Sequence, residues 1–72
     1  MEREKVESSN LVSIGYDASK RILEVEFKGG GLYTYSQVPE EVYTDLMRSS
    51  SKGKFFAAVI RPVYRGEKCT KI

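Results

Sequence analysis

The chain has 72 residues, of which 40% are hydrophobic and 31% are charged, and its formal net charge is +2. A single domain of this size buries only about 60% of its unfolded surface, which leaves little room for a deep active site. With no histidine and one cysteine, Cys69, the chain lacks the usual near-neutral acid–base group, an internal disulfide and a cysteine-built zinc site. We therefore expect a non-enzymatic domain that folds without a cofactor or a metal.

Charge is distributed unevenly along the chain. Residues 1–46 carry five Lys or Arg against nine Asp or Glu, a net charge of −4, whereas residues 47–72 carry seven against one, a net charge of +6. A basic second half is a hint of a polyanionic partner, although basic tails also serve solubility. The polar opening MEREKVESSN and the lack of a long apolar run predict no signal peptide, no membrane span and a cytoplasmic location.

The first 28 residues predict a lead-in and two strands. Residues 1–8 are polar and are expected to form a flexible lead-in. Residues 11–16, LVSIGY, predict a strand with Val12 and Ile14 on one face and Leu11 on the other. The residues DASK favour a turn, because Asp and Ser side chains can bond to nearby backbone groups. The next strand, residues 22–27, has a clear apolar face, made of Leu23, Val25 and Phe27.

Residues 29–35, GGGLYTY, predict a tight hairpin turn and a third strand in which Tyr33 and Tyr35 point the same way. The loop length decides which way, because a slip of one residue exchanges the two faces of a strand. A loop of the first two glycines alone places Phe27 opposite Leu32 and turns both tyrosines outward.

A loop of all three glycines instead places Phe27 opposite Tyr33 and Val25 opposite Tyr35, so that both tyrosines belong to the core. We favour this register, because the alternative face of Leu32 and its neighbours is poorly apolar and a small core needs the aromatic area. An exposed pair that stacks nucleic-acid bases is the alternative.

The second half of the chain predicts two helices. Pro39 suits the first position of a helix over residues 39–49, and two glutamates follow it at the positive end of the helix dipole. Ser51 is predicted to cap a shorter helix over residues 52–60, which Pro62 ends. Residues 66–72 are expected to be a basic tail. The predicted core consists of Val25, Phe27, Tyr33, Tyr35, Leu46, Phe55, Phe56 and Ile60.

These elements predict an α+β fold. Strands precede helices instead of alternating with them, so we expect a three-stranded antiparallel β-meander followed by a longer and a shorter helix packed on one sheet face. The predicted domain spans residues 9–65.

The order and spacing of several short motifs resemble the KTSC domain, which is named after a segment at the C-terminus of some lysyl-tRNA synthetases. The resemblance covers residues 9–64 and is carried by Gly15-Tyr16-Asp17, Leu23, Val25, Phe27, Tyr33-x-Tyr35, Val38-Pro39, Ser51-x-Gly53-x-Phe55-Phe56, Ile60, Arg61 and Tyr64. The function of this family is regarded as unknown. Attachment to a synthetase suggests RNA binding by association, and the resemblance implies no more than that.

The segment SKGK is the predicted nucleic-acid contact. Ser51, Lys52, Gly53 and Lys54 combine a helix N-terminus, a hydroxyl, a flexible residue and two cations, which suit a phosphate group. Arg61 and Arg65 would extend the contact, with Lys68 and Lys71 farther along the basic strip. A helix cap with solvated lysines is the structural alternative. A P-loop is not predicted, because Arg48 stands where its leading glycine is required.

Two other features carry no predicted chemistry. Glu24 and Glu26 resemble a catalytic carboxylate pair, but alternating acids are common on the wet face of a strand. Cys69 has basic neighbours that favour a thiolate, yet it lies in a predicted tail and is assigned no role.

The sequence thus predicts a small module that binds RNA, tRNA-like or single-stranded, through a basic helix N-terminus. The alternative is a protein-interaction module that uses a sheet edge or the acidic sheet face.

Overall fold

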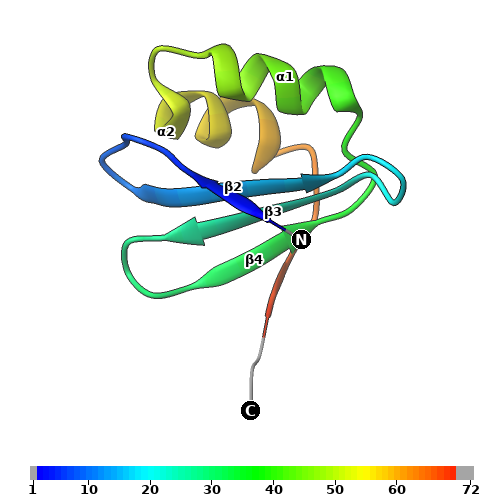
Figure 1. The fold of residues 1–72 in the computed structure, drawn as a ribbon, viewed down its shortest axis with the longest axis horizontal. Coiled ribbons are helices and arrows are strands. Elements are labelled where there is room, and N and C mark those ends of the chain that lie inside the picture. The colour runs from blue at the N-terminus through cyan, green and yellow to red at the C-terminus, as the bar shows by residue number, and fades with distance from the viewer. Residues whose placement is uncertain (1, 70–72) are drawn as a thin grey trace.

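The computed structural model describes residues 2–69, which form an antiparallel sheet with helices on one of its faces (Figure 1). The sheet has five strands in the order β1-β2-β3-β4-β5. These are β1 (Arg3–Lys5), β2 (Leu11–Asp17), β3 (Ile22–Phe27), β4 (Leu32–Tyr35) and β5 (Gly66–Lys68). The helices are α1 (Glu40–Arg48), α2 (Lys52–Phe55) and the π-helix η1 (Phe56–Ile60). The α+β class is therefore confirmed.

The prediction of three strands was wrong, because each end of the chain adds one. Strand β1 comes from the expected lead-in and pairs with β2, while β5 comes from the expected basic tail and pairs with β4. Both strands are three residues long, charged and exposed. Such segments show no apolar alternation for sequence analysis to detect, and short charged strands are how proteins protect sheet edges.

Strand β2 contains an irregularity that overturns its predicted faces. Leu11 lies opposite Phe27, but Ser13 already lies opposite Glu26, so Val12 is an extra residue in the ladder. This β-bulge puts Leu11 and Ile14 on the same face, where both are fully buried. The predicted grouping of Val12 with Ile14 was therefore wrong.

The β3–β4 hairpin has the predicted faces but a different register. Val25 lies opposite Tyr33 and Leu23 opposite Tyr35, a shift of two residues from the three-glycine prediction. The loop is Lys28–Gly30, because the Phe27 N–H donates to the Gly31 carbonyl over 2.8 Å and the Gly30 N–H donates to the Phe27 carbonyl over 3.0 Å. Gly30 has φ +96°, which fits a turn that ends in a left-handed glycine. A register shift of two residues keeps every side chain on the same face of the sheet, so both tyrosines face the helices as predicted.

The helices begin and end close to the predicted residues. Pro39 occupies the N-cap position of α1, and Ser49 occupies its C-cap position. The shorter predicted helix is present as α2 followed by η1, in which the Arg61 N–H donates to the Phe56 carbonyl over 2.9 Å. Pro62 lacks an N–H, and its ring would collide with the Ala58 carbonyl in a regular α-turn, which favours the wider π-turn.

The core lies between the sheet and the helices. Of the predicted core residues, Val25, Tyr35, Leu46, Phe56 and Ile60 are buried, and Phe27, Tyr33 and Phe55 are partly buried against them. Among residues 2–69, every helix is too short or too polar to cross a lipid bilayer.

Candidate nucleic-acid interface

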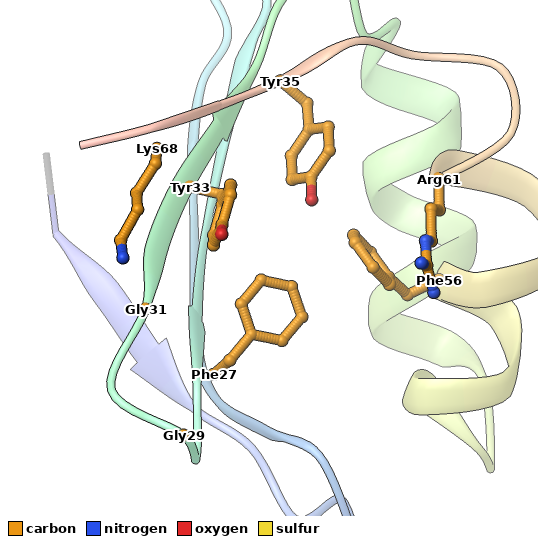
Figure 2. A pocket seen from close by; sticks show the side chains of 8 residues that line it. All are labelled: Phe27, Gly29, Gly31, Tyr33, Tyr35, Phe56, Arg61 and Lys68. Atoms are coloured by element: carbon orange, nitrogen blue, oxygen red, sulfur yellow. The ribbon is translucent and has the colours of Figure 1, made fainter.

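An open hollow lies between the β3–β4 hairpin and η1, and aromatic rings make its walls (Figure 2). Its volume is about 490 Å³, within the range typical of small-molecule sites. We call it the aromatic hollow, lined by Phe27, Gly29, Gly31, Tyr33, Tyr35, Phe56, Arg61 and Lys68. These aromatic residues were predicted to be core, and of the predicted nucleic-acid contact only Arg61 lines this hollow.

The four rings of the aromatic hollow hold one another in edge-to-face contacts. Phe27 contacts Tyr33 with ring centroids 5.5 Å apart and Phe56 with centroids 5.3 Å apart, and Phe56 also contacts Tyr35 at 5.3 Å. Edge-to-face pairs at this distance each stabilise by about 0.5–1.5 kcal/mol beyond their buried area. The rings therefore form one connected wall.

Two close-packed glycines position the tyrosine rings. A Cβ atom on Gly31 would lie 2.9 Å from Tyr33 Cε1, and one on Gly66 would collide with the ring of Tyr35. Tyr33 therefore lies flat over its own hairpin, and Tyr35 lies over the neighbouring strand β5. Both rings are held close to the sheet, and Tyr35 also reaches Phe56 of η1, with ring centroids 5.3 Å apart.

Tyr33 and Tyr35 have different environments. Tyr35 is only 6% exposed, whereas Tyr33 is half-buried. Burial raises the pKa of the Tyr35 phenol above 10.0, with the neighbouring Tyr33 adding to the effect. The Tyr35 hydroxyl thus stays protonated at neutral pH, and Figure 2 shows it directed into the hollow, where it can donate a hydrogen bond.

Two cations border the aromatic hollow, and none of its described lining residues is acidic. Lys68 comes from β5, directly opposite Tyr33. Arg61 follows η1, and the wider π-turn explains its position. In a regular α-helix five residues are about 1.4 turns, so Arg61 would point away from Phe56, but the bond to the Phe56 carbonyl brings it back to the same side.

The predicted SKGK segment begins α2, and none of its residues lines the aromatic hollow. The Ser51 side chain makes no capping hydrogen bond, and the Lys52 ammonium donates to the Ser49 carbonyl over 3.1 Å. Gly53 packs against the loop after β1, since a Cβ there would lie 3.1 Å from Ser8 Oγ. Lys54 is exposed. Ser51 thus holds the N-cap position without the predicted side-chain bond, and Lys52 is bonded to the backbone instead of solvated, so the structural alternative describes Lys54 alone. Phosphate binding at this segment stays a prediction.

The remaining predicted cations are divided. Arg61 borders the aromatic hollow, whereas Arg65 lies exposed between η1 and β5 and does not line it. Lys71 lies outside the described residues. Lys68, which sequence analysis ranked below Arg65, is the second cation at the hollow, and only its pairing in β5 reveals this position.

The acidic face of the sheet is partly neutralised by β1. Arg3 Nη1 lies 2.7 Å from Glu24 Oε1, and Arg3 Nε donates to Ser13 Oγ over 3.0 Å. The hydrogen bond to Glu24 raises the pKa of the Arg3 guanidinium. Ser13 Oγ in turn donates to Glu26 over 2.8 Å. Within the described chain, no group of three His, Cys, Asp or Glu side chains is arranged to hold a metal ion.

Comparisons with known proteins agree with this fold. A sequence profile of the KTSC domain matches residues 7–64. An uncharacterized protein from Stutzerimonas stutzeri is 47% identical over 62 residues, which cover 86% of this chain and 87% of that protein. The crystal structure of a KTSC domain protein from Yersinia pestis superposes with a TM-score of 0.93 at 40% identity, covering 96% of this chain and 97% of the other.

A third relative is much larger. A lysine–tRNA ligase from Nostoc punctiforme is 33% identical over 63 residues, which cover 88% of this chain but only 11% of the ligase.

Proposed function

The chain belongs to the KTSC domain family, and we propose that it is a non-enzymatic module that binds single-stranded RNA in the aromatic hollow. The observation that carries the proposal is one open site that combines aromatic rings, of which Phe27 and Tyr33 are only partly buried, with Arg61 and Lys68. Single-stranded nucleic acids are bound by aromatic rings that stack bases and by cations that follow the backbone.

Charge supports a polyanionic ligand. Arg61 and Lys68 both belong to residues 47–72, whose net charge is +6, and the acids of β3 lie on the opposite face of the sheet. An anionic backbone would meet two cations at the hollow without crossing an acidic surface. The planar Arg61 guanidinium also matches the geometry of a phosphate group.

The relatives support RNA as the polyanion. The name lysine–tRNA ligase states an RNA substrate for those proteins, and a segment similar to this chain makes up 11% of one of them. We therefore extend the proposal to tRNA-like RNA with unpaired nucleotides.

The competing proposal is a protein-interaction module. The strands that sequence analysis expected at the sheet edges, β2 and β4, are paired with β1 and β5. An added peptide strand would have to pair with a three-residue charged strand, which is a poor template.

RNA titration tests the proposal. Fluorescently labelled tRNA and ten-nucleotide single-stranded RNAs are titrated with the protein at several salt concentrations. We expect a Kd tighter than about 10⁻⁴ M at low salt and, for two neutralised phosphates, a log–log salt slope of roughly −1.4. Affinity no tighter than that limit for every RNA, even at low salt, would overturn the proposal.

Charge reversals then locate the contact. Arg61→Glu should weaken binding at least tenfold, whereas Lys20→Glu makes the same charge change in the turn between β2 and β3, at the far end of the sheet, and should have little effect. Lys54→Glu separates the two candidate sites. A loss with Lys54→Glu but not with Arg61→Glu would move the contact to the SKGK segment.

A further inference from the structure

A second hollow adjoins the aromatic hollow on the other side of Phe27. It has a volume of about 300 Å³ and is bordered by the loop before β2, the β3–β4 turn and α2. The residues that line it but not the aromatic hollow include Asn10, Lys28, Gly53 and Ala57. No acidic side chain is among its described lining residues.

The two hollows share four lining residues, Phe27, Gly29, Phe56 and Arg61. The edge-to-face pair of Phe27 and Phe56, with centroids 5.3 Å apart, therefore separates two compartments of one groove. Arg61 borders both compartments. An exposed guanidinium that borders both compartments, beside the two phenylalanines that they share, matches the chemistry of a dinucleotide, in which one phosphate joins two bases.

We propose that the groove binds two consecutive nucleotides, with one base in each hollow and the linking phosphate on Arg61. This inference rests on the proposed RNA-binding function and specifies its unit of recognition. Lys68 borders the aromatic hollow alone and Lys28 the second hollow alone. These two lysines are placed to meet the phosphates on either side of the dinucleotide.

Asn10 is the residue that can distinguish bases in the second hollow. Its main chain is already engaged, because its carbonyl accepts from the Lys28 N–H over 2.9 Å and its N–H donates to Ser8 Oγ over 3.3 Å. These bonds hold the residue at the edge of the hollow, while its exposed side-chain amide can both donate and accept. An amide of this kind pairs with the edge of an adenine or another base that offers both groups.

Short ligands test the inference by NMR shift titration at millimolar concentration. The ligands are the adenosine and uridine 5′-monophosphates, the four ribodinucleotides that combine the two bases, and each dinucleotide with a neutral methylphosphonate linkage. We expect the best phosphate-linked dinucleotide to bind at least tenfold more tightly than either mononucleotide, and shifts at both Tyr33 and Asn10. A neutral linkage should remove most of that gain.

Two variants and one control variant identify the groups involved. In Arg61→Gln the phosphate and methylphosphonate dinucleotides should bind equally, whereas Lys20→Gln should keep the wild-type difference. Asn10→Ala should reduce the difference in affinity among the four dinucleotides. Amide spectra of each variant establish that the fold is intact.

The outcomes separate this inference from the proposed function. If longer RNA binds but dinucleotides bind no better than mononucleotides, or bind below detection, the two-nucleotide groove is wrong and RNA binding stands. If a methylphosphonate linkage costs nothing in the wild-type protein, Arg61 does not bind the linking phosphate. If neither short nor long RNA binds, the proposed function itself fails.

Discussion

Replacing Gly31 with alanine tests how the aromatic hollow is built. The new Cβ would lie 2.9 Å from Tyr33 Cε1 and 3.6 Å from Cδ1, whereas optimal carbon contacts are about 3.5–4.0 Å. Gly31 does not have a positive φ, so its backbone accepts alanine and the whole effect falls on the tyrosine ring. The ring must move by roughly 0.6–1 Å, which disturbs its edge-to-face contact with Phe27.

The expected cost follows from the contacts that the ring would lose. Disturbing one edge-to-face pair costs up to about 1.5 kcal/mol, and forcing the ring off its preferred rotamer costs about 0.5–1.5 kcal/mol. We expect Gly31→Ala to destabilise by roughly 1–2 kcal/mol, which for a domain of this size lowers the Tm by about 4–15 °C.

Gly29→Ala is the matched control. Gly29 lines the same hollow, but its added Cβ would have no neighbour within 4 Å. Alanine there restricts the unfolded chain and should leave stability unchanged or raise it by about 0.4–1 kcal/mol. Urea unfolding of both variants gives the comparison.

A double-mutant cycle refines the test. In a Tyr33→Ala background the cost of Gly31→Ala should largely disappear, because no ring remains to be displaced. Equal costs of Gly31→Ala in the two backgrounds, or equal stabilities of the two glycine variants, would refute the packing of Tyr33 over Gly31.

Three further predictions concern the fold. In the bulge of β2, Leu11→Ala should destabilise by about 2–5 kcal/mol in urea unfolding and Val12→Ala by clearly less, since only Leu11 is fully buried; the reverse order would contradict the bulge. Gln37 has φ 61°, so Gln37→Gly should stabilise by up to about 1 kcal/mol, and a loss of stability would refute strain there. The hydrogen bond from Ser19 lowers the pKa of Asp17 below its ordinary 3.8. The stability that this bond gives the folded state is therefore present above pH 3.8 and is lost as the pH falls through the lowered pKa. Wild type should therefore exceed Ser19→Ala in stability at pH 6 and lose that advantage near pH 2, and a constant difference across this range would exclude the linkage.

Sequence reasoning succeeded where a repeating apolar pattern was present. The alternation in β3 and the proline and glutamates that begin α1 predicted both elements and the side that Val25 faces. It failed where the structure depends on long-range pairing. Strand β5 is defined only by its pairing with β4. The bulge adds one residue to β2, which leaves the apolar composition of the strand unchanged but moves the residues after it to the opposite face.

The candidate site was only half predictable, for a related reason. Arg61 was chosen for its charge, and Tyr33 and Tyr35 for their shared face, but sequence analysis assigned them to separate roles. The π-turn before Pro62 and the β4–β5 pairing bring these groups together, and neither appears in a local pattern. The close approach of Gly66 to Tyr35 is likewise a contact between residues far apart in the chain.

The aromatic hollow is also part of the core, and this limits how its function can be tested. Tyr35 and Phe56 are each only 6% exposed and belong to the buried cluster, so removing either ring would cost about 3–5 kcal/mol. A domain this small has a total stability of only about 5 kcal/mol or somewhat more. Loss of RNA binding in Phe56→Ala would therefore be indistinguishable from unfolding. Arg61 and Lys68 are exposed, contribute little to packing, and lie on the same hollow. Their substitution changes the ligand contact while leaving the rings in place. Variants of the two cations, and not variants of the aromatic residues, therefore test whether the hollow binds RNA.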